Sequence, residues 1–206
     1  MLSGFRLVRL SCLLLIVDGV CAAQGALSQA ELTKRASREF AGEHYAEAER
    51  DFRELTRADP SNLESYAYLG HALFRQKKYE AAIAPYEKAL DLEKRGKALP
   101  QKDHRILIDQ LVMSYGMDGQ LQKVHAVLDP AIQQDPEYPL NYYNLACAYA
   151  EDGDKPKVLA NLQRAFDRKA NILNGEQMPD PRADSSFQKY VGDADFVSLM
   201  KKLGYK

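Results

Sequence analysis

The stretch from residue 66 to residue 92, YAYLGHALFRQKKYEAAIAPYEKALDL, decides the fold class of this chain. Its first half has apolar or small residues three and four positions apart, as one face of an α-helix requires: Tyr66, Leu69, Gly70, Leu73 and Phe74. Its second half repeats that spacing from Tyr79 to Leu90. The stretch therefore predicts two amphipathic helices joined by a tight turn, with Gly70 and Ala82 small enough for a close helix crossing.

This spacing resembles that of the tetratricopeptide repeat, whose pattern is W-x2-L-G-x2-Y, then A-x3-F and a closing P. The residues at the corresponding positions are Tyr66, Leu69, Gly70, Leu73, Ala82 and Tyr86, and Lys94 stands where the family has its proline. The resemblance implies an all-α fold, a solenoid of helix-turn-helix repeats in which each unit buries its apolar face against the next.

Related patterns flank this stretch and predict about four repeats, at residues 28–60, 61–94, 103–136 and 137–166. Capping-box patterns at Ser28-Gln29-Ala30-Glu31 and Ser61-Asn62-Leu63-Glu64 indicate helix starts. The third repeat starts 42 residues after the second (Leu63 to Arg105) and not 34, so eight residues are inserted. We expect the 93–102 insertion to form a surface loop or an extended helix end, with Asp103 capping the next helix. Pro85 and Pro130 fall inside second helices, where we expect bends and not breaks.

The repeat period ends after Phe166. A third capping-box pattern, Ser185-Ser186-Phe187-Gln188, and a capping Asp193 indicate two short helices. This tail resembles the closing segment of many bacterial tetratricopeptide proteins, which implies that residues 167–206 form a C-terminal helical cap.

Residues 1–23 have the layout of a secretory signal peptide, because Arg6 and Arg9 precede an apolar run and Cys21-Ala22-Ala23 offers small residues for cleavage. The apolar run is shorter than the roughly 20 residues that span a membrane. We expect an exported protein, periplasmic or secreted, without a membrane span after cleavage. An uncleaved N-terminal anchor and a misassigned start of the sequence are the alternatives. Cleavage after Ala23 leaves Cys147 as the remaining cysteine, so no internal disulfide is expected.

Composition and motifs disfavour several function classes. Lys and Arg together number 28 and Asp and Glu 29, so no basic excess indicates nucleic-acid binding. The four histidines do not form a metal-binding spacing, and no cofactor or metal is expected. Cys147 lies between Ala146 and Ala148, as a small packing residue would. We therefore expect a non-catalytic protein, with a Cys147-dependent thiol enzyme as a less favoured alternative.

The family resemblance implies a concave groove lined by the first helix of each repeat, which binds a peptide or protein segment. The candidate protein-binding residues are Tyr68, His71, Arg75, Asp109, Gln110, Met113, Tyr143, Asn144 and Cys147, with Phe74, Met117 and Glu151 beside them. The clamp by which some family members hold a C-terminal carboxylate is not reproduced. The alternative is an accessory subunit of an envelope complex that docks through its convex face or the 93–102 insertion. The partner is unidentified, and self-association stays open.

Overall fold

The computed structural model describes residues 27–205, so the signal-peptide prediction for residues 1–23 lies outside the described part. Residues 27–205 form helices without strands, which confirms the all-α prediction. The helices are α1 (Gln29–Ala41), α2 (Tyr45–Ala58), α3 (Leu63–Arg75), α4 (Tyr79–Lys94), α5 (Gln101–Met117), α6 (Leu121–Gln134), α7 (Pro139–Asp152), α8 (Lys155–Asp167) and α9 (Ala194–Lys202). Two short 3₁₀ helices, η1 (Lys169–Asn171) and η2 (Ser185–Tyr190), lie between α8 and α9.

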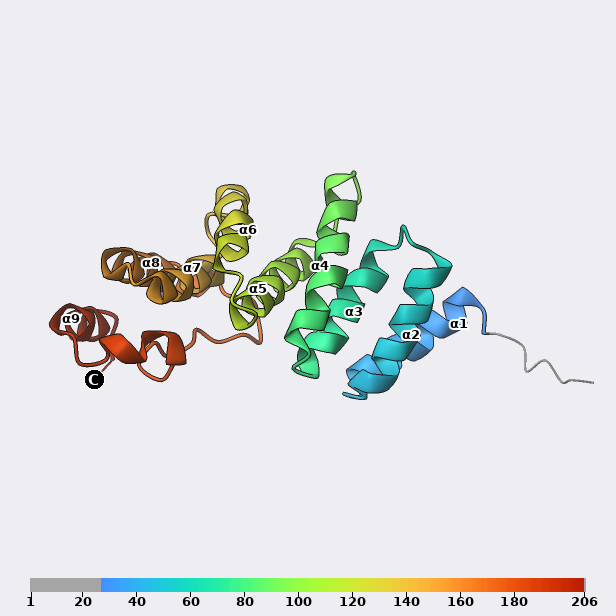
Figure 1. Cartoon of the computed structure of the whole chain (residues 1–206), viewed down its shortest axis with the longest axis horizontal. Helices are drawn as coiled ribbons and strands as arrows, with labels where there is room; N and C mark the ends of the chain where they lie inside the picture. Colours follow the sequence, from blue (N-terminus) through green and yellow to red (C-terminus); the bar gives the residue numbers. More distant parts are fainter. Residues whose placement is uncertain (1–26, 206) are drawn as a thin grey trace, which may run out of the picture.

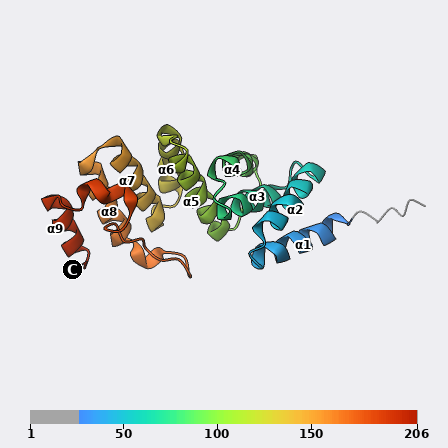
Figure 2. The same ribbon diagram turned by 60° about the horizontal axis from the view of Figure 1, so that its bottom comes forward.

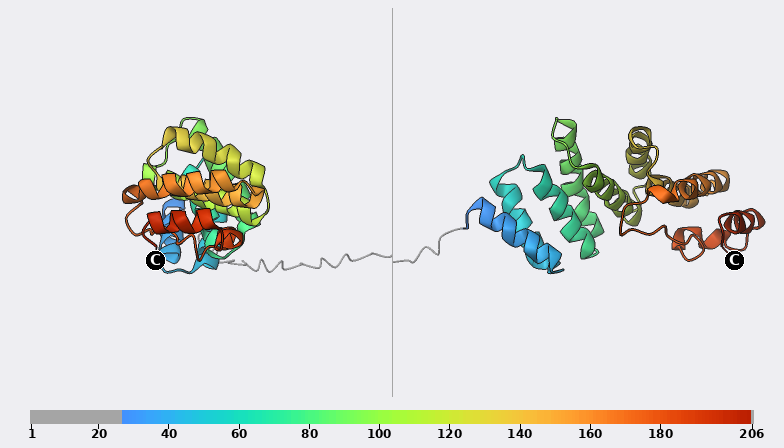
Figure 3. Two further views of the ribbon diagram at one scale, coloured as in Figure 1. Left: turned by 90° about the vertical axis from the view of Figure 1, so that its left-hand side faces the viewer. Right: turned by 180° about the vertical axis from the view of Figure 1, so that it is seen from behind.

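The α-helices stack as antiparallel pairs along one axis, from α1 and α2 at one end to α7 and α8 near the other (Figure 1). After α8 the chain turns back, and η2 and α9 lie beside the last pair (Figure 2). The end-on view shows the helix pairs overlying one another, and the view from behind shows the stack from its other side (Figure 3). This is the repeating helix-turn-helix solenoid that the sequence spacing predicts.

The observed helix caps confirm some of the predicted capping residues and correct others. Ser28 and Glu31 form the reciprocal capping box at the start of α1, and Asp193 caps α9, as predicted. The second box is wrong in detail, because Ser61 bonds Asp59 and Asn62 caps α3 by accepting from the Ser65 amide. The third box is wrong in the same way.

In that third box, Asp184 and not Ser185 accepts from the Ser186 amide, at 2.9 Å, and the helix that follows is a 3₁₀ helix. Both errors have one cause. A neighbouring Asp or Asn carries a stronger or better-placed side-chain acceptor than the serine that the pattern selects.

The insertion extends the two helices that flank it and leaves a short connection between them. α4 continues to Lys94 and α5 begins at Gln101 after Pro100, so residues 95–100 alone form the connection. The prediction that Asp103 caps α5 is wrong, since Asp103 lies inside the first turn. There its negative charge still faces the positive end of the helix dipole. α4 and α6 run continuously through Pro85 and Pro130, so neither proline breaks its helix.

Gly70 allows the close crossing predicted for the second repeat. A Cβ atom built on Gly70 would lie 2.4 Å from the Tyr86 ring, closer than two carbon atoms can approach. Tyr86 is fully buried there, and Ala82 is buried on the same helix. The small residues of α3 and α4 thus make room for a buried tyrosine at the helix contact.

Two hydrophobic cores divide the molecule between the third and fourth repeats. The first joins α1 to α6, with Leu145 and Ala148 of α7 at its edge. The second joins α7 and α8 to the tail through Tyr143, Phe166, Phe187 and Phe196. We call these parts the N-terminal block (α1–α6) and the C-terminal block (α7–α9). Within residues 27–205, no helix is long and apolar enough to cross a membrane.

Candidate functional site

The first helices of the repeats line the inside of the stack. α3 packs on α5 and α5 packs on α7, whereas no pair of second helices packs as closely within residues 27–205. Helices that touch their counterparts in the next repeat lie on the shorter side of a curved stack. The candidate residues predicted on α3, α5 and α7 therefore share one face, which we call the inner face.

A buried hydrogen-bonded cluster joins α3 to α5 on this face. His71 Nδ1 lies 2.8 Å from Gln110 Oε1 and 2.9 Å from the Tyr86 hydroxyl oxygen, and the Tyr86 hydroxyl also donates to Gln110 Oε1. Burial lowers the pKa of His71 to about 4, so the ring is neutral at pH 7. A neutral ring that donates from Nδ1 satisfies the geometry. His71 and Gln110 thus hold two repeats together.

A second bridge joins α5 to α7. Asn144 Nδ2 donates to Asp109 Oδ1 at 2.7 Å. Burial raises the pKa of Asp109 to about 6, although the hydrogen bond from Asn144 acts in the opposite direction. At neutral pH Asp109 is therefore mostly ionised, and the desolvation of its charge destabilises the fold. A cationic group that reached it would be attracted strongly.

The chain's own tail covers the inner face of α7. Tyr143 is only 2% exposed, its hydroxyl donates to Asp184 at 2.9 Å, and its ring meets Phe187 edge-on at 5.7 Å. Cys147 is partly buried beside it, and burial raises the pKa of its thiol. Because the thiolate is the nucleophilic form, a raised pKa gives no support to the thiol-enzyme alternative.

The open part of the inner face carries exposed apolar side chains. Tyr68 on α3 is 39% exposed, and Met113 and Met117 on α5 are 44% and 66% exposed. The Tyr68 ring stacks on Phe52 and meets the His71 ring edge-on. His71 in turn bonds to Gln110 on α5, one helical turn before Met113. We call these three exposed residues, which lie on the neighbouring helices α3 and α5, the open patch.

The charged groups around the open patch are mostly acidic. Burial raises the pKa of the Tyr68 hydroxyl, and the nearby carboxylates of Asp103 and Glu64 raise it further. Arg75 is a cation on this helix, but its guanidinium lies 4.6 Å from the centre of the Tyr45 ring and 3.4 Å from Glu43. Glu64 and Asp103 form no ion pair among residues 27–205, so the patch combines apolar contact area with unpaired negative charge.

The structure separates the predicted candidates into three groups. Tyr68, Arg75 and Met113 are exposed, and His71, Asp109, Gln110 and Asn144 form the bridges between repeats. Tyr143 and Cys147 lie beneath the tail. Sequence reasoning missed Asp184 and Phe187 as the residues that cover α7. The available signal was the Asp-x-x-Phe spacing, which occurs at 184–187 and again at 193–196.

The remaining histidines are paired with carboxylates. His44 lies 2.9 Å from Glu39, His104 lies 2.8 Å from Glu93 and His125 lies 2.8 Å from Asp152. In the described part of the chain, no group of three or more His, Cys, Asp or Glu residues could hold a metal ion. These histidines thus link neighbouring turns and helices.

Comparisons with known proteins agree with this architecture. Residues 33–98 match the tetratricopeptide repeat family. A crystal structure of MamA protein shares the fold, with a TM-score of 0.66 at 19% identity over 85% of this chain and 89% of that one. MamA from Desulfovibrio magneticus RS-1, residues 41 to the end, gives 0.63 at 18% identity over 85% and 92%.

YrrB, described as a tetratricopeptide protein with an unusual peptide-binding site, gives a TM-score of 0.61 at 13% identity over 85% of this chain and 84% of that one. No curated protein sequence matched the chain. At these identities the likeness shows the fold. The repeat spacing, the family match over residues 33–98 and the shared solenoid together support the resemblance to the tetratricopeptide repeat family.

Proposed function

We propose that the chain is a non-catalytic interaction module that binds a peptide or protein segment on the open part of its inner face. Its fold is one used by protein-interaction scaffolds. The observation that carries the proposal is the open patch, because Tyr68, Met113 and Met117 expose apolar area on two adjacent inner helices. Aromatic and Met side chains are enriched at protein interfaces.

The charge of the inner face defines the segment's chemistry. Asp109 is partly buried and its pKa is raised, and Glu64 and Asp103 lie near Tyr68. A ligand with apolar side chains would cover the open patch, and a Lys or Arg beside them would approach these carboxylates. The segment therefore carries apolar residues next to a basic one. YrrB supports a peptide ligand by its description alone.

A random peptide library displayed on phage tests this proposal directly. We expect enriched peptides to combine an apolar residue with Lys or Arg, and Tyr68→Ala or Met113→Ala to weaken their binding by about tenfold, or about 1.4 kcal/mol. Met113 is exposed, so its replacement leaves the fold intact. Val197→Ala, an exposed residue of α9, is the matched control. Equal binding by wild type and both inner-face variants would reject the open patch as the site.

A second candidate function, an accessory subunit docked through the convex face, is favoured by a cavity between α6 and α8. The variants of the phage experiment separate the two functions. A partner that Tyr68→Ala and Met113→Ala retain, and that a change beside this cavity releases, would assign docking to the outer side.

We also propose that the protein acts after export, in a periplasm or outside the cell. The support is the signal-like pattern of residues 1–23. N-terminal sequencing of the protein from the cell envelope is expected to begin at Gln24. A protein that retains Met1 and stays in the cytoplasm would contradict export, without affecting the proposal for the inner face.

A further inference from the structure

A polar pair in the first repeat has a mismatched counterpart in the fourth. Arg35 and Asp51 occupy the same repeat positions as Leu145 and Asn161, since 145 − 35 and 161 − 51 both equal 110. The sum of the repeat offsets, 34, 42 and 34, is also 110. The two middle repeats have apolar pairs at these positions, Leu69 with Pro85 and Leu111 with Val127.

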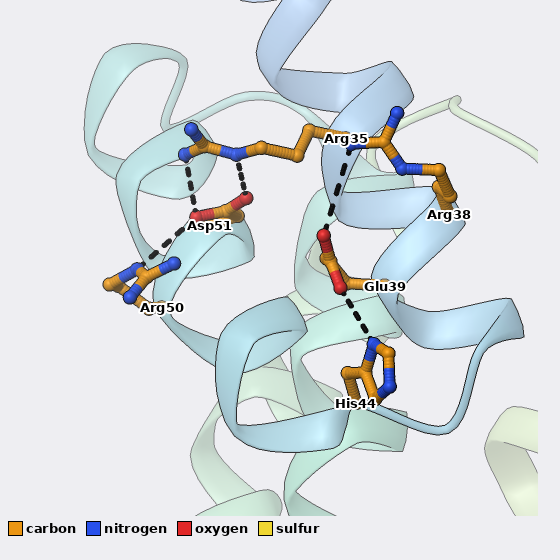
Figure 4. A network of polar contacts seen from close by, with 6 residues as sticks. All are labelled: Arg35, Arg38, Glu39, His44, Arg50 and Asp51. Carbon is orange, nitrogen blue, oxygen red and sulfur yellow. Dashed lines mark hydrogen bonds and ion pairs between the residues drawn. The ribbon is translucent and has the colours of Figure 1, made fainter.

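In the first repeat the polar pair is complete (Figure 4). Arg35 donates from Nε and a terminal nitrogen to both carboxylate oxygens of Asp51, the second bond at 2.8 Å. Arg50 also reaches Asp51, at 3.4 Å. Asp51 is fully buried, which such pairing makes tolerable. The position on the second helix thus accepts a guanidinium.

In the fourth repeat the acceptor is present without its donor. Asn161 is only 4% exposed and its Nδ2 donates to the Lys157 carbonyl at 2.9 Å. Its Oδ1 is buried without a hydrogen-bond partner in the described residues, because Leu145 stands where the first repeat has Arg35. A buried acceptor without a partner destabilises the fold, because it has lost its hydrogen bonds to water.

A cavity of about 490 Å³ opens beside this acceptor on the outer side, between α6 and α8. It is lined by Asn161, Asp129, Leu145, Tyr149, Ile132 and Ala160, with Gln133, Lys157 and Arg164 completing its wall. The Asp129 carboxylate makes no ion pair within residues 27–205, so it is available to pair with a basic side chain of a bound partner. The apolar walls suit the methylene stem of a long basic side chain.

The two basic residues that line the cavity, Lys157 and Arg164, differ in their ion pairs. Lys157 Nζ lies 2.7 Å from Asp154 and 4.7 Å from the centre of the Tyr149 ring. The exposed Arg164 guanidinium makes no ion pair among the described residues. Arg164 would repel an isolated cation but would pair with a carboxylate next to it. Charge complementarity thus favours a guest that carries both signs.

We propose that this cavity binds an arginine side chain of a protein partner, followed or preceded by an acidic residue. The guanidinium pairs with Asp129, and a rotation of the Asn161 side chain turns its buried Oδ1 toward the cavity, where it accepts from the guanidinium as Asp51 accepts from Arg35 in the first repeat. The adjacent carboxylate pairs with Arg164, and the arginine stem packs against Leu145 and Tyr149. This site lies away from the inner face and does not depend on the function proposed for it.

The dipeptide N-acetyl-Arg-Asp-amide tests the site, with the side-chain amide signals of Asn161 in a ¹⁵N–¹H spectrum of the full chain as the readout. We expect a saturable shift with a dissociation constant of about 1 to 10 mM, as a single anchor gives. The same dipeptide with neutral citrulline in place of arginine is expected to bind at least about tenfold more weakly, since it loses the charge-assisted pair.

Two variants keep the test independent of folding. Asp129→Asn changes an exposed residue and is expected to weaken binding about tenfold. Asn161→Leu places an apolar side chain where the middle repeats already have Pro85 and Val127, and should remove the arginine preference. Binding to this variant is followed through the backbone amide signal of Ala160, which also lines the cavity. Tyr68→Ala, on the inner face, is the control that leaves binding unchanged. Equal binding of the arginine and citrulline peptides, or full binding by Asp129→Asn, would overturn the proposal.

Discussion

The N-terminal and C-terminal blocks use the same inner face in opposite ways. In the N-terminal block, Tyr68, Met113 and Met117 are exposed on α3 and α5. In the C-terminal block, Tyr143 on α7 is buried under Asp184 and Phe187. One block thus presents this face to solvent, and the other treats it as a part of its core.

One repeat position has three different environments in the three successive inner helices. His71, Met113 and Cys147 are equivalent, 42 and 34 residues apart. His71 is buried in a bridge, Met113 is exposed, and Cys147 lies under the tail. The repeat pattern places a side chain on the inner face, but its neighbours decide whether a ligand can reach it.

The largest expected effect comes from disrupting the packing of the tail on α7 in the C-terminal block. Phe187→Ala removes a fully buried ring from the second core and is expected to cost about 3 to 5 kcal/mol of unfolding free energy. Urea unfolding measures this loss, and hydrogen exchange should increase in α7–α9 while α1–α4 keep their protection. Val197→Ala, exposed in α9, should change stability by less than about 0.5 kcal/mol. A similar increase of exchange in α1–α4 would show that the two blocks are one cooperative unit.

Gly70→Ala probes the packing of the N-terminal block. The added methyl group would meet the buried Tyr86 ring at 2.4 Å, so we expect a loss of about 2 to 3 kcal/mol in thermal or urea unfolding. Gly116→Ala is the matched control, because a Cβ atom there meets nothing within 4 Å and alanine favours the helix. If Gly70→Ala were as stable as Gly116→Ala, the close crossing of α3 and α4 would be wrong.

Asp109→Asn tests the bridge between the two blocks. The folded-state pKa of Asp109 is raised from 3.8 to about 6, so its ionisation destabilises the fold progressively as the pH rises from about 4 to above 6. At roughly 1.4 kcal/mol per pKa unit the effect is at most about 3 kcal/mol, and we expect about 2. Asp109→Asn should therefore be more stable than wild type at pH 8 and equal to it near pH 3.5.

Unfolding curves of both proteins across that range check this prediction. The lowered pKa of His71, about 4, removes stability from both as the pH falls below 6.5, and the difference between them cancels this effect. A difference that stays constant with pH would contradict the raised pKa of Asp109.

The smallest effect concerns the turns inside the repeats. One residue in each turn has a positive φ: Glu43, Lys77 and Gly119 in the N-terminal block, and Gly153 in the C-terminal block. A side chain in this conformation costs about 1 kcal/mol relative to glycine. Lys77→Gly should therefore stabilise the protein by up to about 1 kcal/mol in thermal unfolding, and Gly153→Ala should destabilise it by a similar amount. The opposite signs would contradict the left-handed conformation of these turns.

Much of the fold could be predicted from the sequence, because local rules determine it. The 34-residue spacing, the capping box at Ser28 and the glycine at position 70 each act through neighbours in the chain or in the adjacent helix. The inner face was harder to predict, because its accessibility depends on contacts across many residues. Tyr143 and Asp184 are 41 residues apart, and no repeat rule relates them. Ser61 and Ser185 do not act as caps because the adjacent Asn62 and Asp184 occupy the N-cap positions of their helices.

The most direct test of the account is methyl NMR of the chain labelled at its methionine ε-methyl groups, titrated with a library-selected peptide. Met113 and Met117 report on the open patch, whereas Met200 lies in the second core and Met178 in the tail. We expect the peptide to shift the Met113 and Met117 signals and to leave those of Met178 and Met200 unchanged. Shifts at Met178 without change at Met113 and Met117 would contradict it, because the peptide would then bind at the covered end.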